Sequence, residues 1–113
     1  MADCIFCGIV EGSVPSDKVY EDDSVLAFRD INPAAPVHVL IIPKKHVPSL
    51  LDAEEEPELM GKVIAAASKV AKELGLAENG FRLVNNCGKH GLQTVYHIHF
   101  HLIGGRQLSW PPG

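Results

Sequence analysis

Three histidines at alternate positions are the residues of this sequence best suited to chemistry. His97, His99 and His101 alternate with Ile98, Phe100 and Leu102. Successive side chains of a strand point to opposite faces, so we expect the histidines on one face and the apolar residues in the core. A neutral imidazole is a good nucleophile near pH 7 and also carries protons, which favours nucleophilic and acid–base chemistry. A solvated polar face is the plain alternative, and the strict alternation counts against it.

A metal ion held by all three histidines is a further interpretation. At a rise of ~3.3 Å per residue, the backbones of His97 and His101 lie ~13 Å apart. A zinc–nitrogen bond is only ~2 Å long, so one ion cannot easily reach all three rings. Two neighbouring histidines could share a metal and leave the third for another role.

Composition and charge exclude several classes of protein. The net charge is −4 with neutral histidines, which argues against a broad nucleic-acid-binding surface but not against a small anionic ligand. No apolar run approaches the ~20 residues of a membrane-spanning helix, and the first residues do not resemble a signal peptide, so we expect a cytoplasmic location. The three cysteines do not suggest a disulfide framework, and Cys4 and Cys7 are more typical of a metal pair or of plain packing.

The elements that position these residues can be predicted from periodicity and turn signals. Residues 4–10 suggest one or two helical turns, 18–21 and 25–29 a hairpin, and 37–42 a buried strand that ends at Pro43. Leu59, Val63, Ala66, Val70 and Leu74 predict a helix over 58–74, stopped by Gly75. Residues 81–85 and 94–103 predict two further strands. We therefore expect a single α+β domain over 1–113: an antiparallel sheet of about five strands, one main helix and a short N-terminal helix.

The stretch from His97 to Ile103 resembles the signature of the histidine triad (HIT) superfamily. Residues 28–33, 37–43 and 104–113, which end in Trp-Pro-Pro-Gly, resemble its histidine triad nucleotide-binding branch, so that the resemblance covers nearly the whole chain. It implies a HIT-like fold, a homodimer, and hydrolysis of adenosine 5′-phosphoramidates and aminoacyl adenylates with release of AMP. Other enzymes of the superfamily are an alternative, but the Trp-Pro-Pro-Gly ending disfavours a dinucleoside polyphosphate hydrolase, and a nucleotidyl transferase would have glutamine in place of His101. A non-enzymatic, zinc-bearing adaptor is the third hypothesis.

The resemblance also implies roles for individual residues. His99 would attack the α-phosphorus and form a covalent nucleotidyl-histidine, while His101 or His38 supplies or relays the proton that the leaving amine needs. We expect Asp30 to bind the ribose hydroxyls, and the loop before the triad to bind phosphate through Asn86, Gln93, Thr94 and the backbone around Val95. An apolar base pocket would contain Ile5, Phe6, Ile9, Phe28 and Ile31. The plainer alternatives are a core role for His38 and the apolar residues, and a turn role for Asp30 and the loop.

A structural zinc site is a further expectation. Some relatives with an N-terminal Cys-x-x-Cys pair bind zinc through two more histidines, and the matching residues here are Cys4, Cys7, His46 and His97. Such a site would be tetrahedral and would stabilise a small domain, and catalysis would need no metal. Two small buried thiols are the alternative.

Trp110 is a plausible anchor of the dimer interface.

One position departs from the family pattern. The family usually has two glycines before the glutamine, whereas this chain has Gly91-Leu92-Gln93. Leucine enters positive φ only at a cost, so the departure bears on the geometry of the phosphate loop. Cys87 and His90 receive no role.

Overall fold

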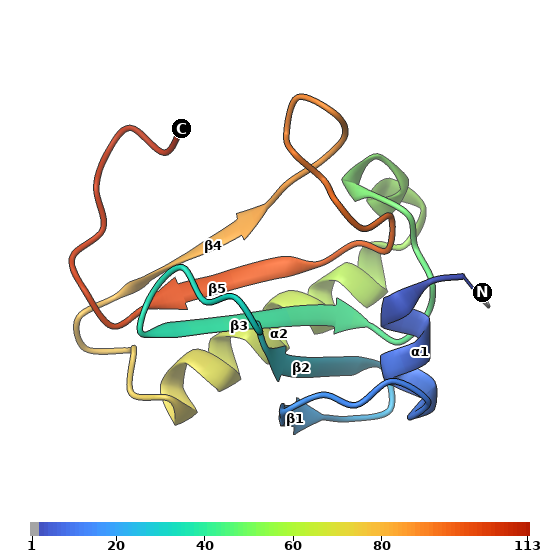
Figure 1. Cartoon of the computed structure of the whole chain (residues 1–113), viewed down its shortest axis with the longest axis horizontal. Helices are drawn as coiled ribbons and strands as arrows, with labels where there is room; N and C mark the ends of the chain where they lie inside the picture. Colours follow the sequence, from blue (N-terminus) through green and yellow to red (C-terminus); the bar gives the residue numbers. More distant parts are fainter. Residues whose placement is uncertain (1–2) are drawn as a thin grey trace.

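The computed structural model describes residues 3–113, which form one antiparallel sheet with a helix on each face (Figure 1). The strands are β1 (Lys18–Glu21), β2 (Val25–Arg29), β3 (Val37–Pro43), β4 (Phe81–Asn85) and β5 (Phe100–Gly104). Their order in the sheet is β1-β2-β3-β5-β4, and each neighbouring pair is antiparallel. The helices are α1 (Ile5–Glu11), the 3₁₀ segment η1 (Leu50–Glu55) and the long α2 (Pro57–Glu73). The predicted α+β class is confirmed.

Each face of the sheet carries its own core. The larger core joins α2 to one face, and its members include Val63, Ala66 and Val70 from the helix and Val39 and Ile41 from β3. The smaller core joins α1 to the other face, and its members are Phe6, Ile9, Leu26, Phe28, Leu40 and Ile42. Burial on both sides explains why β2 and β3 are almost continuously apolar.

The last strand is shorter than the sequence predicts. The prediction covered 94–103, but β5 begins at Phe100, and residues 95–97 form a bend. At this point β4 ends, since Asn85 pairs with Phe100, and the pairing of β5 with β3 stops at Ile41 although β3 continues to Pro43. The alternation nevertheless persists, since Ile98, Phe100 and Leu102 lie in the larger core. The apolar residues of this stretch therefore face the core as predicted, although residues before Phe100 are not paired in the sheet.

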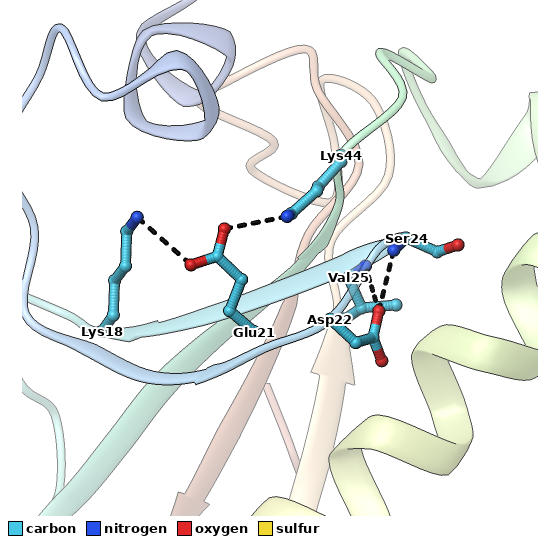
Figure 2. A network of polar contacts seen from close by, with 6 residues as sticks. All are labelled: Lys18, Glu21, Asp22, Ser24, Val25 and Lys44. Atoms are coloured by element: carbon cyan, nitrogen blue, oxygen red, sulfur yellow. Dashed lines mark hydrogen bonds and ion pairs between the residues drawn. The ribbon is translucent and has the colours of Figure 1, made fainter.

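A network of charged groups fastens the β1–β2 hairpin to the end of β3 (Figure 2). The Glu21 carboxylate pairs with Lys44 at 2.8 Å and with Lys18 at 3.4 Å. In the turn, the Asp22 carboxylate accepts the backbone N–H groups of Ser24 and Val25, both at 2.8 Å. These bonds keep the pKa of Asp22 low, with the Tyr20 hydroxyl as the largest cause. Within residues 3–113, none of the helices has the length and apolar character that crossing a bilayer requires.

Candidate functional site

His99 is held in one tautomer by the backbone. Its ring is buried, and Nδ1 lies 2.9 Å from the carbonyl oxygen of His97. A carbonyl only accepts hydrogen bonds, so Nδ1 must carry the hydrogen. In the neutral ring Nε2 then keeps its lone pair, which is the form that a nucleophile needs. The edge of the Phe6 ring packs against the same imidazole, with ring centroids 5.0 Å apart.

The neighbouring histidines form a directed chain of hydrogen bonds. The Ala34 N–H donates to His38 Nδ1 at 2.9 Å, so the neutral His38 ring carries its hydrogen on Nε2. That Nε2 donates to His101 Nδ1 at 2.9 Å, and the hydrogen of neutral His101 is therefore on its own Nε2. The rings of His99 and His101 lie 5.1 Å apart. The backbone thus gives one ring a free lone pair and its neighbour a free N–H, which are the groups required for attack and for proton donation.

Burial keeps His101 uncharged. It lowers the pKa of His101 to about 4, and repulsion from His99 and His38 adds to the effect while Asp30 opposes it. At pH 7 the ring is therefore neutral in the free protein. A phosphate anion bound beside it would favour its protonated form, because opposite charges stabilise each other at short range.

Asp30 lies next to the histidine chain. Its Oδ2 is 3.4 Å from His38 Nε2, while Oδ1 accepts the Asn32 N–H at 2.8 Å. Both roles predicted for Asp30, ribose binding and a turn, thus have a structural basis. Oδ1 holds the turn, and Oδ2 faces the histidines.

The donor atoms of Asp30, His38 and His101 are close enough together to hold a metal ion. Ligation through His38 Nε2 would move the hydrogen of that ring to Nδ1, where it would face the Ala34 N–H. Two donors would then oppose each other. The hydrogen bonds that link Ala34, His38 and His101 therefore favour proton transfer over metal binding at this cluster.

A second cluster contains the four residues expected to bind zinc. The Cys4 Sγ lies 3.4 Å from His97 Nδ1, and the Cys7 Sγ lies 3.6 Å from His97 Nδ1 and 3.3 Å from His46 Nδ1. Bonds of about 2.3 Å to sulfur and 2.0–2.1 Å to nitrogen, at a tetrahedral angle, would place these atoms about 3.5 Å apart. His97 Nε2 donates to the Pro43 carbonyl at 2.8 Å, which leaves Nδ1 unprotonated and facing the thiols. The residues therefore fit a closed tetrahedral zinc site.

Without a metal, this cluster favours its uncharged forms. Burial lowers the pKa of His97 and raises the pKa of Cys7. The neighbouring Cys4 thiol makes a smaller contribution that also raises the pKa of Cys7. Cys4, Cys7 and Cys87 are free thiols.

The loop before the triad gives its predicted residues different environments. The Gln93 side chain is buried, and its Nε2 donates to the carbonyls of Pro48 and Val95 at 2.8 and 3.1 Å. Its Oε1 accepts the Gly88 N–H at 3.0 Å. Both amide hydrogens are therefore engaged, and Gln93 shapes the loop instead of offering a free donor. Asn86 is half-buried and Thr94 is exposed.

The predicted base-pocket residues divide into two groups. Phe6, Ile9 and Phe28 are buried in the smaller core, where Phe6 and Phe28 meet edge to face at 5.6 Å. Ile5 and Ile31 are 52% and 92% exposed and remain free to contact a ligand.

Asn85 is a residue that sequence reasoning missed. Its Nδ2 donates to the His99 carbonyl at 2.9 Å from the end of β4. In the sequence, Asn85 is only a polar residue at the end of a predicted strand, which is a weak indication of a functional role. Only the pairing of β4 with β5 reveals that this position faces the start of the triad strand.

Comparison with known proteins decides the family. A model of the HIT domain matches residues 11–108. The chain belongs to the HIT domain family. The purine nucleoside phosphoramidase of Escherichia coli (strain K12) is 51% identical over 106 residues, which cover 93% of this chain and 89% of that protein. The 14 kDa zinc-binding protein of Brassica juncea is 54% identical over 114 residues, with 98% and 100% covered.

The structures agree with this assignment. The crystal structure of a HIT family hydrolase from Legionella pneumophila Philadelphia 1 superposes with a TM-score of 0.95 at 51% identity, covering 98% of this chain and 100% of that one. The HIT resemblance predicted from the sequence is thus confirmed, and the relatives support its histidine triad nucleotide-binding branch.

Leu92 is where this HIT chain departs from its expected pattern. The residue has φ of +60° and is the one non-glycine with positive φ among residues 3–113. The backbone therefore keeps a conformation that suits glycine, and the leucine side chain points outward, 77% exposed.

Proposed function

We propose that this protein is a purine nucleotide phosphoramidase that hydrolyses the P–N bond of adenosine 5′-phosphoramidates through a covalent intermediate on His99. The observation that carries the proposal is the pair of opposite tautomers, an unprotonated Nε2 on His99 and a protonated Nε2 on its neighbour His101. A hydrolase of phosphorus–nitrogen bonds is also the class that the named relatives support.

In the first step, Nε2 of His99 forms a bond to the α-phosphorus and the P–N bond of the substrate breaks. The bound phosphate favours the protonated form of His101, which gives its Nε2 proton to the leaving amine and returns to a neutral ring beside its partner His38. The His99 ring becomes cationic and keeps its Nδ1–H on the His97 carbonyl. In the second step, the oxygen of water bonds to phosphorus while the bond from phosphorus to His99 Nε2 breaks, and the proton of the water returns to His101. AMP leaves, and the overall reaction consumes one water molecule.

The remaining predicted residues bind the nucleotide in this proposal. Asp30 accepts from the ribose hydroxyls, and Ile5 and Ile31 contact the base beside the Phe6 and Phe28 rings. Asn86, Thr94 and the backbone around Val95 contact the phosphate. Gln93 contributes indirectly, because its three bonds fix the loop.

The direct test is AMP release from adenosine 5′-phosphoramidate by the wild type, His99→Ala and His90→Ala. His90 is an exposed loop histidine and serves as a matched control. We expect wild-type turnover, a loss of about 10³-fold or more in His99→Ala, and wild-type rates in His90→Ala. Mass spectrometry of a rapidly quenched reaction should find a nucleotidyl adduct on His99. Absence of wild-type turnover would refute the proposed function.

We also propose that Cys4, Cys7, His46 and His97 hold one zinc ion, which would cross-link α1 to the sheet. The donor distances and the name of the Brassica relative support this. Metal analysis should give one zinc per chain, falling to well under one in Cys7→Ser. Reduced thiols also suit the cytoplasmic location that we propose, which cell fractionation tests.

A homodimer is the assembly that we propose. β4 is an outer strand of the sheet, and Phe81 on it is 44% exposed. Trp110, in the C-terminal segment beyond β5, is 80% exposed. Such features are typical of interfaces between copies. Sedimentation should give a dimer that Trp110→Ala weakens, and a monomer at micromolar concentration would contradict the proposal.

A further inference from the structure

Helix α1 contacts both the zinc cluster and the catalytic cluster. Cys4 caps its N-terminus and accepts the Cys7 N–H through sulfur at 3.4 Å. Phe6 lies between these two cysteines in the sequence. Its ring meets His99 at 5.0 Å with an interplanar angle of 86°, and His97 at 5.9 Å. This short helix and its N-cap residue therefore carry two candidate metal ligands and a side chain that packs directly against the candidate nucleophile.

His97 also belongs to both clusters. Its side chain is fully buried, with Nδ1 facing the two thiols and Nε2 bound to the Pro43 carbonyl. Its own carbonyl accepts the Nδ1–H of His99 at 2.9 Å and sets the tautomer of that ring. Any rotation of the His97 residue would thus move the acceptor that orients His99.

We propose that Phe6 and His97 are positioning residues that couple occupancy of the Cys/His cluster to the tautomer and orientation of His99. Helix α1 has only seven residues, and a helix this short is marginal unless tertiary contacts hold it. A metal ion on Cys4, Cys7, His46 and His97 would fix both the helix and the His97 backbone. Removal of the metal would loosen the Phe6 contact and the His97 carbonyl together.

The expected size of the coupling follows from the bond at stake. One ordinary hydrogen bond biases an equilibrium by about fivefold. We therefore expect the ratio of the Nδ1–H to the Nε2–H tautomer of neutral His99 to fall about fivefold when the bond to His97 is lost. Metal loading would then act on the chemical step through His99 without touching substrate.

The test is long-range ¹H–¹⁵N NMR of the full chain with ¹⁵N-labelled histidine. The His99 signals are assigned by their loss in His99→Gln. Zinc-loaded protein should show a single Nδ1–H tautomer, chelator-treated protein a mixture, and zinc-reloaded protein the first spectrum again. A tautomer ratio that changes by less than twofold between the loaded and stripped forms would overturn the proposal.

A second variant covers the case in which the stripped protein unfolds. Phe6→Leu keeps all four candidate ligands but removes the ring edge against His99, and Leu26→Val is a matched truncation in the same core. With zinc bound, we expect Phe6→Leu to mix the tautomers and to lower kcat about fivefold, whereas Leu26→Val does neither. A raised KM with unchanged kcat and tautomer would overturn the proposal, because Phe6 would then act only on the base.

The rate measurements rest on the proposed function, but the NMR measurement does not. If the wild type releases no AMP, the tautomer ratios of the loaded and stripped forms still decide the coupling. Failure of the proposed function and failure of this inference are therefore distinguishable.

Discussion

Replacing Leu92 with glycine should stabilise this protein. At φ of +60°, a residue with a β-carbon is strained by about 1–2 kcal/mol, because Cβ approaches the following carbonyl oxygen. Glycine removes that strain but adds about 0.5–1 kcal/mol of backbone entropy to the unfolded chain. The Leu92 side chain is 77% exposed, so its loss removes little packing. We expect a net gain of about 0.5–1 kcal/mol in the free energy of unfolding, or about 2–4 °C in Tm.

Two further variants separate backbone strain from exposure of an apolar side chain. Leu92→Asn should also stabilise, because asparagine tolerates the left-handed region better than leucine. Leu92→Ala keeps the β-carbon and should leave the free energy of unfolding nearly unchanged. The assay is urea unfolding and calorimetry of zinc-loaded proteins at one concentration, since bound metal and association both shift apparent stability. If Leu92→Ala gained as much stability as Leu92→Gly, removal of the apolar side chain would be the cause, and the strain argument would be refuted.

The remaining predictions concern residues around the triad. Burial depresses the pKa of His101 to about 4, so below about pH 6.5 the unfolded chain binds more protons than the folded one. The urea midpoint should therefore fall as the pH drops from 7 toward 4. This fall should be less steep in His101→Gln. An equal decline in both proteins would contradict this cause. Gln93→Ala should cost about 2 kcal/mol in the free energy of unfolding, because it removes three bonds to the backbone, whereas Lys89→Ala in the same loop should change it by less than about 0.5 kcal/mol. Asn85→Ala should cost about 1 kcal/mol through the lost bond to the His99 carbonyl, and no change in the urea midpoint would show that this bond contributes nothing to stability.

The sequence predicted the features that depend on short-range geometry. The α2 helix runs from Pro57 to Glu73, close to the predicted 58–74, because its apolar positions recur at helical spacing and Gly75, with φ of +77°, stops it. The alternation between His97 and Leu102 assigned the two faces correctly, since side chains of an extended chain alternate whatever they pair with. The Cys4–Cys7 spacing indicated a metal pair or plain packing, and the two sulfur atoms lie within 4.8 Å of each other across the first turn of α1.

The tertiary structure decided the features that depend on distant partners. His38 and His101 are 63 positions apart, and only the β3–β5 pairing shows which ring donates to which. The backbone groups of Ala34 and His97 then fix the tautomers, and no local pattern encodes such bonds. Gln93 was expected to offer a donor to phosphate, yet three distant or turn-related backbone groups engage its amide. Residue types and spacing thus gave the chemistry available to this chain, whereas the assignment of each hydrogen required its folded neighbours, because a hydrogen bond depends on where two groups meet in space.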